Sequence, residues 1–380
     1  MHEIEFKDFI KLQRGFDLPE HSRVNGDVPV VASTSITSFH NVSKVKAPGV
    51  VTGRSGALGE VQYIDMDFWP LNTTLWVKDF KNNNPKYVYY FLKTLNLKRF
   101  NSGAGVPTLN RNDLDTLKIK IHREPEQKII AKILSNYDDL IENNNKRIKI
   151  LEEMAQKIYK EWFIDFKFPG HETTTFKDSE LGKIPSNWAV KKIKDVLDLI
   201  KDATHAGEHL KNLRYVPIDC IPRKSFYLST SENYKNAQSS LLLFKRSDIL
   251  FGNMRSYFHK VIVAPFDGVT RTTCFVLRPK SDILFSWAYL TMFQNNTVSY
   301  SAQHSKGATI PYAFWEGGLS DMKIVHPSLD ILDKFNSIVE PMLNFIQESY
   351  FKLENLRQTR DILLPRLISG EINVDSMEIK

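Results

Sequence analysis

The sequence predicts an α+β fold: two mixed α/β domains separated by two long antiparallel helices that form a coiled-coil spacer, with a pseudo-two-fold internal repeat. Three observations predict this arrangement. The chain has 380 residues, about two to three times the size of a typical domain. Motifs of the first half return in the same order in the second half. Each half also ends in one long segment whose apolar residues have helical spacing.

Three pairs of short segments carry the internal repeat. Residues 103–107 (GAGVP) return as residues 307–311 (GATIP), 204 positions later. At nearly the same offset, two further pairs resemble each other: residues 73–77 with 272–276, and 117–119 with 322–324. Solenoid repeats have periods of about 20 to 50 residues, so this offset indicates duplication of a whole domain-plus-helix unit.

The two helical segments are the clearest secondary-structure prediction. Residues 126–163 carry apolar side chains at steps of three and four without an intervening Gly or Pro, and would extend about 57 Å as a helix. Residues 332–363 have similar spacing, although Pro341 and Pro365 are expected to bend or end that helix. We expect the two apolar stripes to bury each other in an antiparallel pair. The alternative is that each helix caps only its own domain.

Polar patches interrupt both stripes, at residues 142–145 and 347–349. They coincide at an offset of about 205 residues and are expected to fix the register of the pair. The predicted organisation has five parts: a first mixed α/β domain (1–124), a first long helix (125–168), a second mixed α/β domain (169–328), a second long helix (329–372) and a C-terminal tail (373–380).

Short strands are predicted in both domains, because β-branched and aromatic runs are bounded there by Gly, Pro, Asn or Asp. The predicted strands lie at residues 28–31, 49–52, 75–77, 117–121, 249–251, 261–263 and 274–277.

Composition excludes several classes of protein. Hydrophobic residues make up 42% and charged residues 25%, as in ordinary globular proteins. No apolar run of about 18 residues and no leader-like start is found, so we expect no membrane partner. Only Cys220 and Cys274 occur, which is too few for a disulfide framework and fits a cytoplasmic location.

Positive charge is concentrated in one stretch. The whole chain has a net charge of +7, and residues 78–123 alone hold ten basic side chains against three acidic ones, with aromatic residues interleaved. Such a stretch, which includes Lys98 and Arg99, suits a surface that faces phosphates. The alternative is a solvated lysine-rich face over a buried aromatic stripe.

Three motifs are weighed for chemistry. Residues 53–59 (GRSGALG) lack the Lys-Ser/Thr ending of a nucleotide loop and the dinucleotide spacing, so a turn approaching DNA phosphates, with Arg54 at its tip, is favoured. Residues 205–209 (HAGEH) match a zinc-peptidase pattern, but Gly207 disfavours the required helix, and His205 is interpreted as a polar contact in a loop. Residues 84–87 (NPKY) are interpreted as a turn. No metal, no cofactor and no catalytic activity are therefore expected.

Several segments together resemble a known family. Residues 12–19 (LQRGFDLP), 28–33 (VPVVAS), 53–59 and 125–127 (PEQ) resemble the first half of a type I restriction-modification specificity subunit. Residues 182–188 (GKIPSNW), 201–205 (KDATH) and 363–372 (LLPRLISGEI) resemble its second half. Ala203 replaces the family's glycine in an Asp-Gly-Thr-His turn, and residues 327–330 (PSLD) replace a second Pro-Glu-Gln start.

The resemblance implies two target recognition domains, each reading one half of a split DNA sequence, with the helices as a spacer. It also implies double-stranded DNA, modification (methyltransferase) subunits and motor-nuclease subunits as partners, which would carry the catalytic sites. Two reading heads would contact DNA edges about one turn, roughly 35 Å, apart. The residues expected to contact DNA are Arg54, Ser55, Lys98, Arg99, Thr204, His205, Asn253 and Arg255.

Alternatives of other classes remain open at this point. They are an autonomous methyltransferase, a scaffold that does not touch DNA, and the recognition subunit of a system that only methylates.

Overall fold

The computed structural model describes residues 1–101, 103 and 105–374. Two predicted features lie partly outside these residues: the repeat motif at Ala104 and the C-terminal tail beyond residue 374. The chain forms two compact units. Unit 1 comprises Met1–Ile141 and Leu356–Lys380, and unit 2 comprises Glu142–Asn355. Within the described residues, no helix has the length and apolarity needed to span a bilayer.

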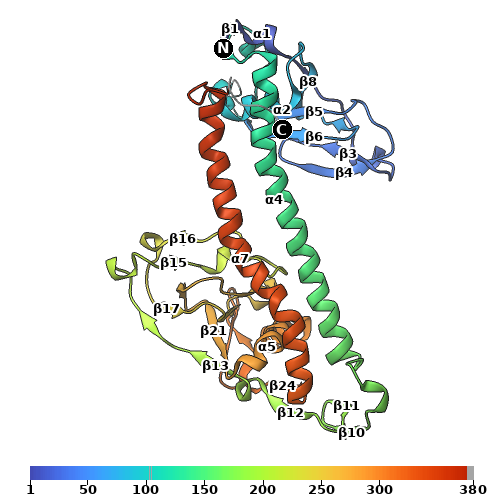
Figure 1. Ribbon diagram of the computed structural model, residues 1–380, viewed down its shortest axis with the longest axis vertical. Helices are drawn as coiled ribbons and strands as arrows, with labels where there is room; N and C mark the ends of the chain where they lie inside the picture. The colour runs from blue at the N-terminus through green and yellow to red at the C-terminus, as the bar shows by residue number, and fades with distance from the viewer. Residues whose placement is uncertain (102, 104, 375–380) are drawn as a thin grey trace. The chain divides into compact units, whose positions relative to one another are not determined.

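Unit 1 contains a four-stranded antiparallel sheet with the order β2-β8-β5-β6 (Figure 1). Its strands are β2 (Lys11–Arg14), β5 (Gly49–Gly53), β6 (Val61–Ile64) and β8 (Thr74–Asp79). A second sheet has the order β4-β3-β7, from β3 (Val28–Val31), β4 (Ile36–His40) and β7 (Trp69–Pro70). The pair β1 (His2–Glu5) and β9 (Lys118–Ile121) leads into the first long helix.

Unit 2 has the corresponding sheet, with the order β13-β21-β18-β19. Its strands are β13 (Leu197–Ile200), β18 (Ile249–Gly252), β19 (Val261–Val263) and β21 (Cys274–Pro279). A five-stranded sheet has the order β14-β17-β20-β15-β16, from β14 (Ala203–Thr204), β15 (Arg214–Tyr215), β16 (Glu232–Asn233), β17 (Leu241–Phe244) and β20 (Gly268–Arg271). The remaining pairs are β12 (Ala189–Lys192) with β24 (Lys323–His326), β10 (Phe176–Ser179) with β11 (Gly182–Pro185), and β22 (Ser305–Lys306) with β23 (Tyr312–Ala313).

The two four-stranded sheets are copies of one topology. β5 of unit 1 corresponds to β18 of unit 2, and each pairs antiparallel with the strands on both sides. Gly53 lies opposite Thr74 in unit 1, and Gly252 lies opposite Cys274 in unit 2. The pair β1·β9 likewise corresponds to β12·β24. The predicted internal repeat and mixed α/β fold are therefore confirmed.

Each unit also contains short helices. They are α1 (Phe6–Phe9), α2 (Pro85–Thr94) and α3 (Asn112–Asp115) in unit 1, and α5 (Phe285–Met292) and α6 (Asn295–Gln303) in unit 2. Of these, α2 contacts β5 and β6 in unit 1, and α5 contacts β19 in unit 2. Residues 84–87 form the start of α2 and not an isolated turn: Asn84 is its N-cap, its side chain accepts the Tyr87 N–H at 3.0 Å, and Pro85 occupies the first helical position.

Two long helices complete the fold, α4 (Glu124–Tyr159) and α7 (Leu329–Ile368). A π-helical turn, Lys160–Ile164, extends α4. Pro341 and Pro365 both lie inside α7, so neither of them ends the helix. Proline removes one helical N–H, but the flanking side chains of Val339 and Leu343 are buried, and their packing outweighs the loss.

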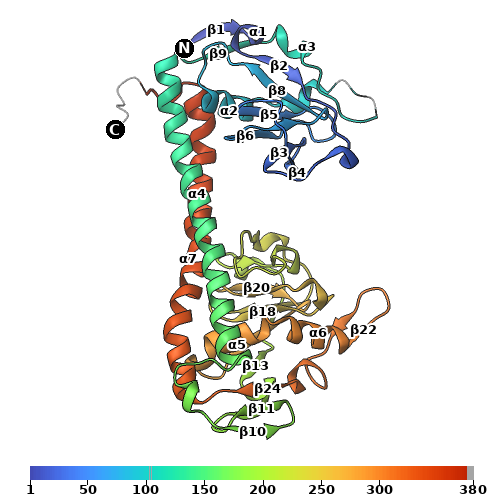
Figure 2. The same cartoon turned by 90° about the vertical axis from the view of Figure 1, so that its right-hand side faces the viewer.

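The helices run antiparallel within each unit. In unit 1, Asp138 of α4 accepts a bond from Arg360 Nη1 at 2.7 Å, while His122, just before α4, contacts the Leu367 carbonyl near the end of α7. Figures 1 and 2 show the ribbons of the two helices side by side. In unit 2, the Arg147 guanidinium lies 4.7 Å from the Phe345 ring centroid, and Tyr159 contacts Phe335. Residue numbers fall on one helix as they rise on the other, which is the predicted antiparallel pair.

The helix pair is part of each unit's core. In unit 1, Ile130 and Leu134 of α4 belong to one apolar cluster with Leu367 and Ile368 of α7. Part of each predicted polar patch is packed inside: Asn144, Gln347 and Ser349 of unit 2 are each no more than 3% exposed, whereas residues 142, 143, 145 and 348 are exposed. Buried polar side chains at such positions favour one register of a helix pair over its neighbours.

Candidate nucleic-acid interface

The glycine-rich loop of unit 1 is held by backbone hydrogen bonds at the end of β5. The N–H groups of Arg54 and Ser55 both donate to the Thr73 carbonyl, at 2.9 and 3.1 Å. The Gly56 N–H donates to the Pro107 carbonyl at 3.0 Å, and the Leu109 N–H donates to the Arg54 carbonyl at 2.8 Å. Residues 54–56 and 107–109, far apart in sequence, therefore form one loop pair.

Unit 2 repeats this framework bond for bond. The N–H groups of Asn253 and Met254 donate to the Thr273 carbonyl at 3.0 and 3.4 Å. The Arg255 N–H donates to the Pro311 carbonyl at 2.8 Å, and the Ala313 N–H donates to the Asn253 carbonyl at 2.9 Å. Arg54 thus corresponds to Asn253, Gly56 to Arg255, and Pro107 to Pro311. One backbone scaffold presents two different sets of side chains.

Gly56 and Arg255 occupy the same backbone position. Gly56 has φ of +82° and Arg255 has φ of +50°, both in the left-handed region that is costly for residues with a side chain. The Arg255 side chain is held close to the loop, since its Nη2 donates to the Thr309 carbonyl at 3.3 Å. A constrained arginine at a strained turn is a feature found at functional sites.

Arg54 and Ser55 lie on the loop, but Arg54 is not at its tip. Its backbone is bonded on both sides and its side chain is half-buried. The Ser55 carbonyl accepts the Ser33 hydroxyl at 3.0 Å. The exposed point of the turn is Gly56, and Arg54 instead extends along a neighbouring hollow.

That hollow has a volume of about 490 Å³ and is lined by Arg14, Arg54 and Arg111 together with residues 108–110, Leu75 and Asn112. Arg14 and Arg111 are exposed. Sequence reasoning did not select these two arginines as DNA contacts. Arg14 could not be identified from the sequence, because only the pairing of β2 with β8 places it opposite Leu75 at the hollow. Arg111 was already visible as part of the basic stretch.

Lys98 and Arg99 lie on a 3₁₀ turn, Leu97–Phe100, and both are exposed. Lys98 lines a second hollow of about 310 Å³ beside Gly56, Ala57 and Pro107, on the other part of the same loop pair. Arg99 packs over the Phe100 ring, 4.7 Å from its centroid. The structure therefore places Lys98 beside the glycine-rich loop, so both can belong to one positively charged surface.

Thr204 and His205 lie at the edge strand β14 and the turn that follows it. The Thr204 hydroxyl contacts His209 Nε2 at 3.0 Å, and the rings of His205 and His209 are 4.8 Å apart. Glu208 accepts the Tyr234 hydroxyl at 2.9 Å, and this bond, together with partial burial, raises the pKa of Tyr234. Residues 205–209 form a turn and one 3₁₀ turn, and the described residues contain no cluster of three or more potential metal ligands.

Asn253 is only 6% exposed, and its side-chain amide donates to the Thr272 carbonyl at 3.0 Å. The amide nitrogen of Asn253 is therefore bonded within the protein, whereas the corresponding residue of unit 1, Arg54, borders a hollow. A role for Asn253 in contacting DNA stays a prediction, and its burial favours its neighbour Arg255.

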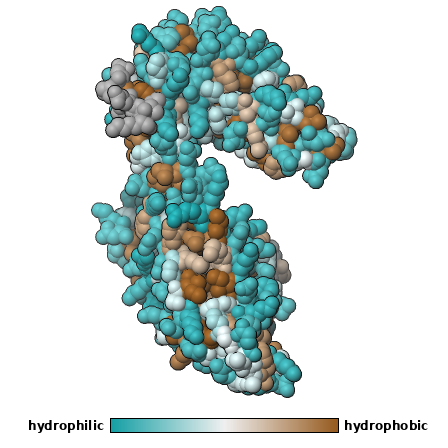
Figure 3. Space-filling view, turned by 45° about the vertical axis from the view of Figure 1, so that its right-hand side comes forward, coloured by the Kyte–Doolittle hydropathy of each residue, from teal (hydrophilic) through white to brown (hydrophobic). Residues whose placement is uncertain are grey.

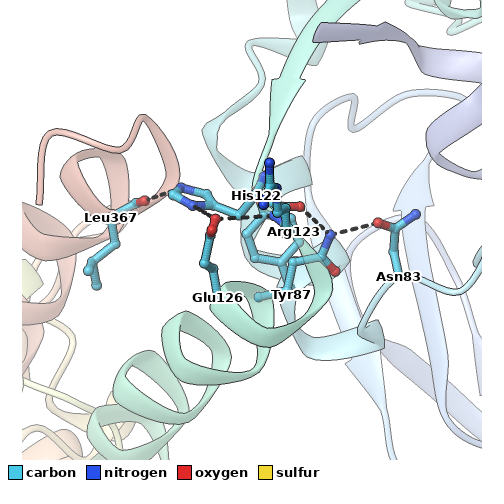
Figure 4. Close-up of polar contacts among 7 residues, drawn as sticks. Asn83, Tyr87, His122, Arg123, Glu126 and Leu367 are labelled. Atoms are coloured by element: carbon cyan, nitrogen blue, oxygen red, sulfur yellow. Dashed lines mark hydrogen bonds and ion pairs between the residues drawn. The ribbon is translucent and has the colours of Figure 1, made fainter. Parts of the chain in front are cut away.

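The Pro-Glu-Gln segment fastens unit 1 to its helices (Figure 4). His122 contacts Glu126 Oε2 at 3.0 Å and the Leu367 carbonyl at 2.9 Å. Gln127 donates to Asn83 Oδ1 at 2.7 Å and to the His122 carbonyl at 2.9 Å. Burial acts to raise the pKa of Glu126, but hydrogen bonds from His122 and the Arg123 N–H outweigh it and lower that pKa. These residues are structural and do not face either hollow.

A duplicated α/β domain with basic loops, mounted on an antiparallel helix pair, defines a class of two-domain recognition proteins. The family model described as "Type I restriction modification DNA specificity domain" matches residues 1–153 and 185–344, well over half of the chain. The chain therefore belongs to this family. It is a family of specificity subunits, not of catalytic ones.

Individual proteins that are similar to this chain are also specificity subunits. The chain is 29% identical over 348 residues to the type I restriction enzyme MjaIX specificity subunit of Methanocaldococcus jannaschii, covering 83% of this chain and 76% of the relative. It is 21% identical to the EcoDI specificity subunit of Escherichia coli, covering 76% and 70%. The crystal structure of a type I S subunit from M. genitalium has the same fold, with a TM-score of 0.66 at 14% identity over 97% of this chain and 96% of that one.

Proposed function

We propose that this chain is the DNA specificity subunit of a type I restriction-modification complex, in which each unit reads one half of a bipartite target. The observation that carries the proposal is that the family match covers both units, and that both present the same loop framework. Relatives with this match are named specificity subunits. The domain boundaries at 1–124 and 169–328 remain part of this proposal.

The loop pairs are the proposed DNA contacts. Arg54, Ser55, Lys98 and Arg99 in unit 1, and Thr204, His205 and Arg255 in unit 2, supply cations and hydrogen-bond donors at loop positions. Cations near the backbone of DNA contribute affinity by releasing counterions, whereas donors that reach base edges contribute sequence preference.

The helices are the proposed spacer and the docking surface for modification subunits, with motor-nuclease subunits completing the complex in the cytoplasm. Large apolar side chains remain exposed on both helices, and these are Leu140, Ile150, Met154, Leu329, Ile338, Phe351 and Ile362. One face of unit 2 also shows an apolar patch amid a largely hydrophilic surface (Figure 3). Exposed apolar clusters of this kind mark surfaces that bind other proteins.

Mapping of methylated bases across the genome of the source organism tests the proposal. Deleting the gene for this chain should abolish methylation at one motif made of two short half-sites with a fixed gap. Restoring the gene should restore that motif. The proposal would be contradicted if the deletion left every methylated motif in place, or if the motif that disappeared did not consist of two half-sites.

A further inference from the structure

The arginine hollow of unit 1 has a structural counterpart in unit 2, and strand register identifies its residues. Arg14 lies opposite Leu75 on β8, directly after Gln13 opposite Trp76. In the matching ladder, Ile200 lies opposite Val276, so the next residue, Lys201, corresponds to Arg14. The loop framework pairs Leu109 with Ala313, which makes Trp315 the counterpart of Arg111 and Glu316 that of Asn112.

These counterparts bring an aromatic contact and an ion pair to the matching place in unit 2. Phe275, which stands where unit 1 has Leu75, packs edge-on against Trp315 with ring centroids 5.9 Å apart. Lys201 forms an ion pair with Glu316, with Nζ and Oε1 3.2 Å apart. An aromatic pair and a neutralised cation thus replace the open, positively charged hollow.

In unit 1 the same positions stay open and charged. Within the part of the chain that the structure describes, the guanidinium groups of Arg54 and Arg111 have no hydrogen-bond or ion-pair partner, and the residues that line the hollow include no carboxylate. The Arg14 Nε makes one long bond, 3.4 Å, to the Asn72 carbonyl. Three guanidinium groups gathered without a counter-charge repel one another, so an external group with several acceptors would stabilise the arrangement.

We propose that this hollow binds a pair of hydrogen-bond acceptors on the target DNA through the forked guanidinium groups of Arg54 and Arg111, with Arg14 adding charge. The inference rests on the proposed function and deepens it: unit 1 reads its half-site through an arginine fork, and unit 2 has no equivalent fork. Two parts of DNA offer paired acceptors to such a fork, the O6/N7 edge of guanine and the oxygens of a backbone phosphate.

The test uses the full chain in complex with its modification subunits and a duplex carrying its selected target. Each guanine of the target is replaced in turn by 7-deazaguanine, which lacks the N7 acceptor but still pairs with cytosine. Binding is compared for the unaltered chain, for Arg111→Ala, and for Arg54→Lys and Arg111→Lys, which keep the charge but lose the fork. Lys201→Ala is the control, because it removes from unit 2 the cation that corresponds to Arg14.

A guanine edge in the hollow predicts that one 7-deazaguanine position weakens binding by about tenfold in the unaltered chain. The same substitution should have no further effect in Arg111→Ala or in either lysine variant, and Lys201→Ala should keep the full effect. A phosphate in the hollow predicts instead that every duplex loses affinity equally in Arg111→Ala, with a salt-dependence slope smaller by about one, while the lysine variants bind nearly normally. Either pattern supports the hollow as a DNA site and identifies the acceptor.

Two results would be negative, and they are distinguishable. If the complex selects a target and binds it equally well with Arg111→Ala and Arg54→Lys, while thermal unfolding shows both variants folded, the hollow is not a DNA site but the proposed function stands. If the unaltered complex selects no target at all, the proposed function itself fails.

Discussion

Arg214 of β15 and Glu354 of α7 form a two-pronged ion pair within unit 2, with Nη1 to Oε1 and Nη2 to Oε2 both 2.7 Å apart. The same guanidinium donates to the Tyr350 hydroxyl at 3.1 Å and lies within 5.6 Å of the Phe266 ring centroid. The hydrogen bond to Glu354 is the main cause of the raised pKa of Arg214. One arginine therefore ties a strand of the recognition domain to the second long helix.

Arg214→Lys should lower the free energy of unfolding by about 1–2 kcal/mol, because a lysine keeps the charge but cannot make two parallel bonds while stacking on the rings. Urea unfolding of the two proteins measures the difference. Glu142→Gln, which removes an exposed ion pair with Lys146, serves as control and should cost less than about 0.5 kcal/mol. Equal effects of the two substitutions would show that the Arg214 fork adds nothing to an ordinary surface pair.

Glu152 of α4 links the first long helix to a loop of unit 2. One carboxyl oxygen, Oε1, accepts bonds from the Ser225 hydroxyl and from the N–H groups of Phe226 and Tyr227, at 2.8, 2.7 and 3.1 Å. Burial raises the pKa of Glu152 and outweighs these three bonds, which act to lower it. The protonated carboxyl is therefore favoured more in the folded chain than in the unfolded one.

Glu152→Gln should remove a pH-dependent part of the stability. Because the folded pKa lies above the unfolded one, the stabilisation by Glu152 is complete at low pH and is lost as the pH rises through the folded value. The stability advantage of the native chain over Glu152→Gln should thus shrink as the pH rises above about 4.5, the ordinary pKa of a glutamate, in urea unfolding. An advantage that grows with pH would contradict the burial argument.

Glu152→Ala separates the hydrogen bonds from the charge. It leaves three donors without their acceptor, whereas Glu152→Gln keeps an oxygen in place, so Glu152→Ala should be about 2–3 kcal/mol less stable than Glu152→Gln at every pH, because neither variant titrates at this position. Glu161→Gln, an exposed carboxylate farther along the same segment, is the control for a change of charge alone.

Sequence reasoning predicted what is encoded locally. The helices follow from apolar residues at steps of three and four, and the repeat follows from motifs such as residues 103–107 and 307–311. It missed what depends on tertiary pairing. Arg14 and Arg111 meet only because β2 pairs with β8 and the loops share backbone bonds. Pro341 was expected to disturb α7, because the burial of its neighbours could not be known from sequence.

Lys98→Ala combined with Arg99→Ala should weaken DNA binding without altering sequence preference. Both side chains are exposed beside the glycine-rich loop, where they suit contacts with phosphates. Losing two phosphate contacts should reduce the slope of log affinity against log salt by about two. The measurement is a salt titration with the selected target and with an unrelated duplex. A change in which duplex is preferred would assign these residues to base reading instead.

Matched insertions in both long helices test the proposed spacer. The division between the units falls at residues 141/142 in α4 and 355/356 in α7, so seven residues added at each point leave the contacts inside both units intact. Seven residues are two helical turns and about 10.5 Å, which keeps each apolar stripe in phase. At about 3.4 Å per base pair, the gap in the methylated motif should grow by about three base pairs while both half-sites stay the same.

An insertion in α4 alone is the control. Its seven extra residues have no partner on α7 and must leave the helix pair, so the gap should stay unchanged or methylation should be lost. A doubly extended protein that methylates the original motif would show that the helices do not set the spacing.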